Sequence, residues 1–449
     1  MEIKVLILAW WHWTRLWPLS RKHYPKQFLK LKEFQNKSLF QQTFERSLKI
    51  TNIENIYVIT NQDYKFHCMN QSKIEERNII LEPVWKNTMW AISLWLDYFS
   101  KEDVVLILPS DHIIENENVF IETIQKSIKY ADKSIITFWI KPTKPYTGYG
   151  YILPKTKNQD ISDVIEFKEK PDKQTAIKYI KNGYYWNSGI FLFQKKIFIN
   201  ELKKNNREYY NIIREWVLEN FDKLPDMSID YWLLEKCKNI KISKLDIYWN
   251  DLWSFDSIQE YLDKINYKNK NIININAKNN FVISGKKDKL VTNIWVSNLI
   301  VVDTSDSLLI ANKWDSQNVK ELVKILKKEK KNILNYSNTV YRPWWKYTII
   351  DKWDGFKIKR LTVLPWKKLS EQLHYHRSEH WVVVSWTAKI TINNKEFILS
   401  KWQSTYISIW TKHRVENCWK INLHIIESQI WDYFEEDDII RFNDDFWRR

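Results

Sequence analysis

Two periodicities of apolar and polar residues alternate along residues 1–265. Short apolar runs predict buried strands, and stretches with apolar residues three or four positions apart predict amphipathic helices. Because strand-like runs alternate with helical ones, we expect an α/β domain with a mostly parallel sheet. The predicted strands are Ile3–Ala9, Ile56–Thr60, Val104–Pro109, Ser134–Thr137 and Gly189–Phe193, and the predicted helices include Ser38–Lys49 and Val119–Ala131.

The pattern changes after residue 265. The segment Asn266–Asn280 is rich in Asn, Lys and Ile, as is typical of a domain junction. Short strand-like repeats such as Asn298–Val302 and Leu308–Ala311 follow, and then a charged helix over residues 316–330. We expect a β-rich connecting domain with one helix at residues 266–338.

The last part of the chain, residues 339–449, has the alternation of half-buried strands. Residues Thr387–Leu399 alternate around Asn393-Asn394, a pair that favours a tight hairpin turn. This pattern predicts an all-β domain.

Composition narrows the class of protein. The chain has 449 residues, 44% of them hydrophobic, which is enough for several buried cores. No apolar run approaches the roughly 18 residues that cross a bilayer, and the first strand begins without a cleavable signal pattern. The net charge of +16 is spread along the chain without a long basic block, and the three cysteines lack any CxxC spacing. We expect a cytoplasmic protein that binds neither membrane nor nucleic acid.

The balance of tryptophan and glycine is unusual, because the chain has 26 Trp and only 6 Gly. Many of the tryptophans stand where a turn is predicted, as in Trp10-Trp11-His12-Trp13 and Pro365-Trp366-Lys367. If twenty of them are read as glycine, the totals become 26 Gly and 6 Trp, which is ordinary. These twenty are residues 10, 11, 13, 85, 90, 95, 139, 232, 253, 295, 314, 345, 353, 366, 386, 402, 410, 419, 431 and 447.

Two explanations of this anomaly remain open. The first is that the gene uses UGA as a glycine codon and was translated with UGA as tryptophan. The second is a protein that is rich in aromatic residues, whose tryptophans should then follow core periodicity. The first explanation predicts strained turns and a crowded loop after the first strand, because glycine adopts positive φ freely and tryptophan does not.

A glycine-rich turn between a strand and a helix lets backbone N–H groups approach phosphate oxygens without an intervening Cβ. With positions 10, 11 and 13 read as glycine, residues 9–18 become AGGHGTRLWP, followed by LSR and then YPKQF at residues 24–28. This run resembles the phosphate loop of sugar-phosphate nucleotidyltransferases, in the form found in mannose-1-phosphate guanylyltransferases. The resemblance implies a Rossmann-like nucleotidyltransferase domain at residues 1–265, and it assigns nucleotide binding to Trp10, Trp11, Trp13 and Thr14.

Further segments extend the resemblance. Residues 82–88 resemble EPxGRNT, a segment that faces the guanine base, which implies base contacts from Glu82, Asn87 and Thr88. Residues 109–112 match PxDH, and residues 249–254 resemble WxDxGSW. The resemblance implies that Asp111 and Asp251 supply the two carboxylates for Mg²⁺.

The sugar side of the site follows from two more matches. Residues 169–171 match EKP, in which the lysine grips the sugar phosphate, and residues 186–189 match WNSG, in which the asparagine contacts the sugar. By resemblance, the sugar-binding residues are Gly150, Glu169, Asn187 and Gly189.

The chemistry agrees with these roles. Nucleotidyl transfer needs positive charge around the triphosphate, which Arg15, Lys26 and Mg²⁺ would supply. Lys170 would hold the attacking sugar phosphate, and in-line attack on the α-phosphorus releases pyrophosphate without a protein nucleophile. The predicted catalytic residues are Arg15, Lys26, Asp111, Lys170 and Asp251.

Four of the nine histidines fall within residues 374–413, and histidines clustered with a carboxylate are typical of a metal site. With the nearby tryptophans read as glycine, residues 366–386 and 402–417 resemble the two cupin motifs of bifunctional guanylyltransferase/phosphomannose isomerases. We expect a cupin (jelly-roll) isomerase domain at residues 339–449. Its metal, Zn²⁺ or a similar divalent ion, would be bound by Gln372, His374, Glu379 and His413.

Neighbouring residues leave alternatives open. His376 is in phase with His374 and competes as a ligand, whereas His380 points to the other face and is expected to be structural. Arg414 fits either a phosphate contact or a surface salt bridge.

The resemblance implies two activities: GDP-mannose and pyrophosphate from GTP and mannose 1-phosphate, and interconversion of the hexose 6-phosphates mannose 6-phosphate and fructose 6-phosphate. Two alternatives are a guanylyltransferase with a purely structural cupin domain, and an inactive protein that binds sugar nucleotides. The sequence leaves the oligomeric state open, a homo-oligomer included.

Overall fold

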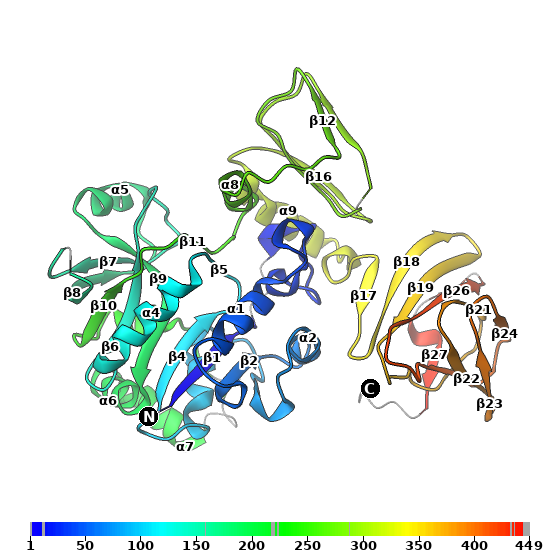
Figure 1. The fold of residues 1–449 in the computed structure, drawn as a ribbon, viewed down its shortest axis with the longest axis horizontal. Helices are drawn as coiled ribbons and strands as arrows, with labels where there is room; N and C mark the ends of the chain where they lie inside the picture. The colour runs from blue at the N-terminus through cyan, green and yellow to red at the C-terminus, as the bar shows by residue number, and fades with distance from the viewer. Residues whose placement is uncertain are drawn as a thin grey trace. The chain divides into compact units, whose positions relative to one another are not determined.

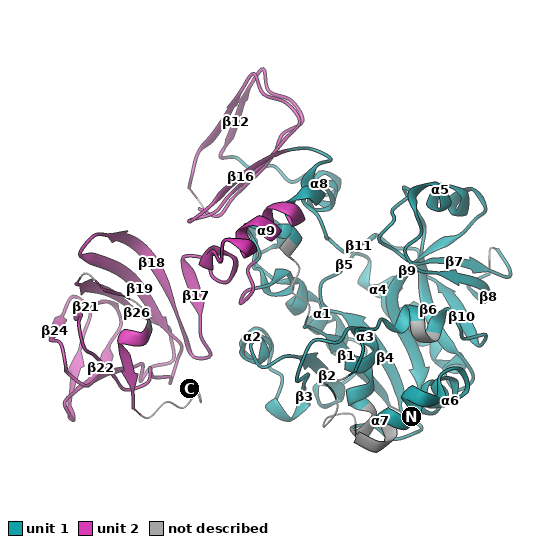
Figure 2. Cartoon of the chain, turned by 180° about the vertical axis from the view of Figure 1, so that it is seen from behind, with its two compact units in different colours: residues 1–20, 25–270, 312–319 teal, residues 21–24, 271–311, 320–449 magenta. Residues whose placement is uncertain are grey.

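The computed structural model describes residues 2–10, 14–157, 159–216, 221, 224–286, 288–431, 433–434 and 436–442. The chain divides into two compact units, shown in two colours in Figure 2. Unit 1 comprises residues 1–20, 25–270 and 312–319, and unit 2 comprises residues 21–24, 271–311 and 320–449.

Unit 1 is built on a nine-stranded sheet in the order β3-β2-β1-β4-β9-β6-β10-β8-β7 (Figure 1). The first four strands in this order pair in parallel, whereas β9 runs antiparallel to both of its main neighbours. The predicted α/β class is confirmed, and the parallel pairing is concentrated in the half of the sheet that contains β1. The strands are β1 (Ile3–Leu8), β2 (Ile56–Thr60), β3 (Ile79–Leu81), β4 (Val104–Pro109), β6 (Ile135–Ile140), β7 (Tyr151–Pro154), β8 (Ile161–Lys168), β9 (Tyr185–Gln194) and β10 (Ile240–Lys244).

Several helices of unit 1, among them α1, α5 and α8, begin at a capping side chain. Ser38 caps α1 by accepting from the Gln41 N–H, and the Gln41 side chain accepts in return from the Ser38 N–H. Of the helices in the described ranges, none is long and apolar enough to cross a bilayer. The helices are α1 (Leu39–Leu48), α2 (Lys65–Gln71), α3 (Thr88–Ser93), α4 (Glu117–Ser127), α5 (Lys173–Lys181), α6 (Lys195–Asn205), α7 (Arg207–Trp216) and α8 (Phe255–Lys264).

Four of the anomalous tryptophans pack into the core of unit 1. Trp10, Trp90, Trp95 and Trp139 are buried among residues of β1, β4, β6 and β9. Burying a large apolar side chain is favourable wherever the backbone allows it.

Six other anomalous tryptophans have positive φ, a conformation that glycine adopts freely and tryptophan does not. All six are exposed, and Trp402 is 79% exposed. They are Trp295 (φ 54°), Trp314 (75°), Trp366 (59°), Trp386 (69°), Trp402 (74°) and Trp410 (59°). The predicted strain is therefore present at these six turns, whereas Trp11 and Trp13 lie outside the described residues.

The first part of unit 2 consists of short parallel strands that repeat every 19 residues. Ile272 of β12 pairs with Val291 of β14, and Phe281 of β13 pairs with Ile300 of β15. Asn293 donates to Asn274 at 2.8 Å across the same 19-residue spacing, so a polar ladder accompanies the backbone pairing. The elements are β12 (Ile272–Ile275), β13 (Phe281–Ser284), β14 (Val291–Ile294), β15 (Leu299–Asp303), β16 (Leu308–Asn312) and α9 (Val319–Lys328).

The rest of unit 2 is a β-sandwich, which confirms the all-β domain that the alternation predicted. Its two antiparallel sheets have the orders β17-β18-β19-β26-β21-β24 and β23-β22-β25-β20-β27, and a shared core lies between them. The strands are β17 (Thr339–Tyr341), β18 (Trp345–Trp353), β19 (Phe356–Val363), β20 (Gln372–His374), β21 (Ser378–Ser385), β22 (Ala388–Ile392), β23 (Lys395–Leu399), β24 (Ser404–Ile407), β25 (His413–Glu416), β26 (Leu423–Ile430) and β27 (Ile439–Arg441).

Candidate active sites

Three predicted catalytic residues meet at one end of the sheet in unit 1. Asp111 follows β4, and Asp251 follows the two-residue strand β11 (Trp249–Asn250). The Lys26 Nζ lies 2.6 Å from Asp111 Oδ2 and donates to the backbone carbonyl of Asp251 at 2.5 Å. One buried lysine side chain thereby joins the Asp111 carboxylate to the backbone of Asp251.

The two carboxylates have different electrostatic environments. Burial alone would raise the pKa of Asp111, but the Lys26 ammonium holds that pKa below its usual value. For Asp251 burial prevails, helped by the charge of Asp111, and raises the pKa to about 6. Carboxylate oxygens are hard donors that suit Mg²⁺, whose charge would also relieve the repulsion between the two acids.

Two further side chains complete this cluster. The Arg15 guanidinium lies 5.0 Å from the centre of the Trp253 ring, and burial lowers its pKa. The Tyr149 hydroxyl donates to Asp251 Oδ1 at 2.8 Å. The sequence reasoning missed Tyr149, although it adjoins Gly150, which was assigned to the sugar.

The predicted sugar-binding residues also lie together. Glu169 Oε1 and Lys170 Nζ are 2.6 Å apart, and the Asn187 N–H donates to the Gly150 carbonyl at 2.8 Å. A Cβ at Gly150 would lie 2.5 Å from Glu169 Oε2, so a larger residue here would displace the Glu169 carboxylate. Gly189 has φ 70°, which also favours glycine.

A buried acid that was not predicted, Asp230, joins this group. Asn187 Nδ2 donates to Asp230 Oδ1 at 3.0 Å, and the Ser228 hydroxyl donates to Oδ2 at 2.5 Å. Burial and then the charge of Asp230 raise the pKa of Glu169 to about 8. The run Ser228–Asp230 resembles an ordinary turn, so only the fold reveals that its acid faces the sugar-binding group.

The predicted nucleotide-binding residues are partly described. Glu82 is buried at the end of β3, and burial raises its pKa to about 8. Asn87 has φ 69° and accepts from the Thr88 N–H at the start of α3. Trp10 is buried, with its ring centre 6.4 Å from that of Trp85. Thr14 begins a 3-10 turn over Thr14–Leu16.

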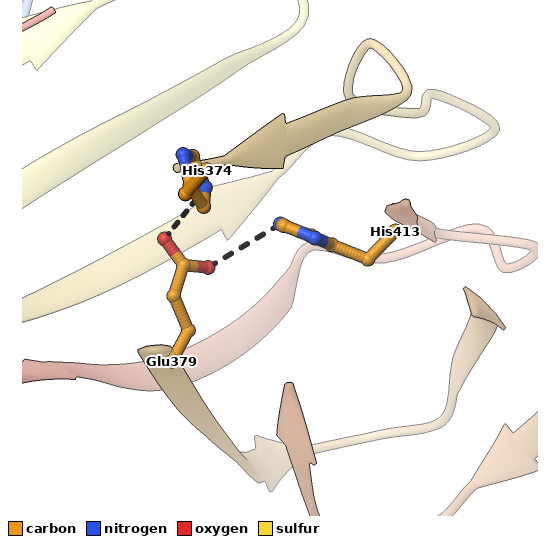
Figure 3. A group of neighbouring side chains, drawn as sticks. All are labelled: His374, Glu379 and His413. Atoms are coloured by element: carbon orange, nitrogen blue, oxygen red, sulfur yellow. Dashed lines mark ion pairs between the residues drawn. The ribbon is translucent and has the colours of Figure 1, made fainter. Parts of the chain in front are cut away.

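The C-terminal domain has a second cluster, formed by His374, Glu379 and His413 (Figure 3). The three side chains come from β20, β21 and β25, are buried, and offer ligand atoms that all lie within 4.8 Å of one another. His374 Nε2 is 3.0 Å from Glu379 Oε1, and His413 Nε2 is 3.5 Å from Glu379 Oε2. Two imidazoles and a carboxylate in this arrangement fit a divalent transition-metal ion.

The other residues that were predicted near the metal site lie in different surroundings. Gln372 Nε2 lies 3.5 Å from His413 Nε2, so Gln372 borders the cluster. His376 is instead paired with Asp438, with Nδ1 and Oδ1 2.8 Å apart, and His380 is exposed. Arg414 is half-buried on β25.

A pocket opens beside this second cluster. Four of its lining side chains are cationic, Arg342, Lys359, Arg377 and Arg441, and the carboxylates among its described lining residues are Glu379 and Glu427. Aromatic and aliphatic side chains such as Tyr347 and Leu361 complete the wall. Such a pocket suits a small, polar and anionic ligand.

These folds and sites define a nucleotidyltransferase joined to a cupin-type domain. Residues 4–268 match the nucleotidyl transferase family model, and the chain belongs to this family. Residues 270–326 match the mannoseP isomerase/GMP-like beta-helix domain, and residues 329–444 match the mannose-6-phosphate isomerase C-terminal family.

Relatives that match over nearly the whole chain support the same family. The mannose-1-phosphate guanylyltransferase of Salmonella montevideo is 40% identical, with the match covering 99% of this chain and all of that protein. The alginate biosynthesis protein AlgA of Pseudomonas putida is 37% identical over 99% of this chain and 96% of its own length. A Thermus thermophilus crystal structure, described as a mannose-1-phosphate geranyltransferase, covers 73% of this chain and all of its own, with 25% identity and a TM-score of 0.64.

Proposed function

We propose that this protein transfers a guanylyl group from GTP to mannose 1-phosphate, and that its C-terminal domain interconverts mannose 6-phosphate and fructose 6-phosphate. The observation that carries the first activity is the Lys26 ammonium held against Asp111 and the Asp251 backbone. Support for the second is the His374, Glu379 and His413 cluster beside a cationic pocket. We propose domains at residues 1–265, 266–338 and 339–449, acting in the cytoplasm on phosphorylated metabolites.

In the transferase step, an oxygen of the mannose 1-phosphate attacks the α-phosphorus of GTP, and the bond to the β-phosphate oxygen breaks. Arg15 and Lys26 would stabilise the negative charge on the triphosphate, and Lys170 would hold the sugar phosphate. Asp111 and Asp251 would bind Mg²⁺, which neutralises charge on the phosphates.

The sugar would bind where Gly150 leaves room beside Glu169 and Asn187. The Asn187 amide is held by Thr137, which donates to its Oδ1 at 2.8 Å, and by Asp230. A side chain fixed at both ends of its amide presents a defined orientation to sugar hydroxyls.

Preference for GTP would rest on Glu82. A carboxylate accepts the adjacent N1–H and N2–H groups of guanine, and adenine has no such donor pair. The Glu82 side chain accepts only one weak bond from the Lys86 N–H, at 3.3 Å, among the hydrogen bonds of the described residues. It therefore retains capacity to bind the base.

In the isomerase domain, Gln372, His374, Glu379 and His413 would bind Zn²⁺ or a similar ion, which polarises the substrate carbonyl. Three arginine side chains of the pocket, Arg342, Arg377 and Arg441, would bind the 6-phosphate. These groups lie beside the metal-binding cluster, as an isomerase requires of a phosphate site.

A paired experiment tests both activities in the full-length protein. Pyrophosphate release is measured with each NTP plus mannose 1-phosphate, and fructose 6-phosphate formation is measured from mannose 6-phosphate. We expect Lys26→Ala to abolish only the first activity and His374→Ala to abolish only the second. Absence of isomerisation in the unsubstituted protein would favour a structural cupin domain, and isomerisation that survives in His374→Ala would refute the metal-site assignment. GDP-mannose binding without pyrophosphate release would favour an inactive binding protein.

A further inference from the structure

The isomerase pocket contains one carboxylate that the metal-binding cluster does not use. Among the described residues that line it, Glu379 and Glu427 are the acids, and Glu379 is held between two imidazoles. Among the hydrogen bonds and ion pairs of the described residues, none joins Glu427 to either imidazole. It is nonetheless buried, at 3% exposure, and lines the cavity.

Two side chains on adjacent strands hold Glu427 in place. It lies on β26, directly across from Trp381 on β21. The Trp381 indole N–H points at both acids, with 3.2 Å to Glu427 Oε1 and 3.0 Å to Glu379 Oε2. Lys359 on β19 places its Nζ 3.1 Å from Glu427 Oε2. The carboxylate is therefore fixed beside the metal-binding cluster without belonging to it.

We propose that Glu427 is the catalytic base of the isomerase, with Lys359 as its charged partner. This assignment rests on the isomerase function proposed above. It gives the pocket the proton-transfer group that aldose–ketose isomerisation requires, since the reaction moves a proton from C2 to C1 of the open-chain sugar.

The step balances with these two residues. The Glu427 carboxylate takes the proton from C2, the C2–H electron pair becomes the C1=C2 bond, and the carbonyl pair moves to O1. The O2–H proton passes to O1 beside the Lys359 ammonium, which stabilises the negative charge on these oxygens. Glu427 then returns its proton to C1 as the C2=O2 bond forms. The sugar is isomerised and the carboxylate is regenerated, with no net oxidation.

Other candidates in the domain are less suitable. His376 is paired with Asp438 and is not among the residues that line the pocket. The Lys359 Nζ is held 3.1 Å from Glu427 Oε2 and so serves as the partner of that carboxylate. The alternative is that Glu427 only neutralises the charge of Lys359, and this structural role makes different predictions.

The test uses Glu427→Gln and Glu427→Asp in the full-length protein. Glu396→Gln is the matched control, because Glu396 forms an exposed Lys–Glu pair with Lys389, at 2.9 Å, in the same domain. Four quantities are measured: isomerase kcat and KM, transferase rate, bound metal, and release of deuterium from C2-deuterated mannose 6-phosphate into water.

We expect Glu427→Gln to lower the isomerase kcat by roughly 10²–10⁴-fold and to abolish deuterium release, with transferase rate and metal content unchanged. Glu427→Asp keeps the charge but retracts the carboxylate, so its kcat should fall with little change in KM, and the domain should still fold. Glu396→Gln should match the unsubstituted protein.

Three results would overturn the assignment. One is a Glu427→Gln or Glu427→Asp enzyme that keeps more than about a tenth of the kcat. Another is loss of bound metal in Glu427→Asp, which would make Glu427 a ligand. The third is an unsubstituted protein without isomerase activity. This result would refute the proposed function itself, and it would be seen before any variant is compared.

Discussion

Replacing Trp402 by glycine should stabilise the C-terminal domain, although it removes a large apolar side chain. Trp402 has φ 74° in the turn between β23 and β24, and 79% of its surface is exposed. The exposed indole contributes little burial, so its removal costs little. The backbone conformation, in contrast, is one that glycine adopts freely.

The magnitude follows from two opposing terms. The left-handed conformation costs a residue with a Cβ roughly 1–2 kcal/mol. Glycine loses more entropy on folding, which gives back roughly 0.5–1 kcal/mol. The net gain is roughly 0.5–1 kcal/mol per site, and the same reasoning applies to Trp386 at φ 69°. A gain of about 1 kcal/mol raises the Tm of a domain of this size by roughly 4 °C.

Trp353 provides the matched control. It lies at the end of β18 and is 72% exposed, but it is not among the described residues with positive φ. Trp353→Gly should therefore leave stability unchanged or reduce it. Unfolding of the full-length variants by heat and urea, followed by far-UV circular dichroism, gives the comparison. Equal destabilisation by Trp402→Gly and Trp353→Gly would refute the backbone argument.

The remaining predictions concern the two sites and the code. Gly150→Ala places a Cβ 2.5 Å from Glu169 Oε2, so pyrophosphate release should fall by roughly 10–100-fold while isomerisation continues. Burial raises the pKa of Glu82 to about 8 from 4.5, so the stability it contributes is full at low pH and lost as pH rises through about 8. Glu82→Gln should flatten that loss in urea unfolding, and an equal slope in both proteins would contradict this. His374→Ala should bind less metal by elemental analysis, and chelation should then no longer lower its Tm. Protein sequencing from the native source should give glycine at Trp402; UGG codons at all twenty positions would exclude the altered code.

Much of the architecture follows from periodicity. Val104–Pro109 was predicted and observed as a strand with the same bounds, because an uninterrupted apolar run can be buried on both faces. Strand direction was not predictable in the same way. The run Tyr185–Gln194 inserts antiparallel beside β4, and side-chain alternation is identical in either direction. Only the connections between the strands and their packing in the sheet determine the direction of a strand.

The site residues also divide into those that the sequence predicted and those that it did not. Residues in recognisable segments, such as Lys26 and Asp111, were predicted and are adjacent in the fold. Tyr149, Asp230 and Glu427 were missed because each is a single polar residue without a spacing pattern, and such residues are usually solvated. Their importance comes from burial and from partners distant in sequence, which periodicity cannot reveal.

The four cationic side chains of the isomerase pocket affect how the enzyme should be handled. Clustered positive charges attract any compact oxyanion, whether or not it belongs to a sugar. Phosphate or sulfate buffers would therefore act as competitive inhibitors of the isomerase and as stabilisers of its fold. Rates measured in such buffers would understate the turnover, and melting temperatures would overstate the stability of the empty domain.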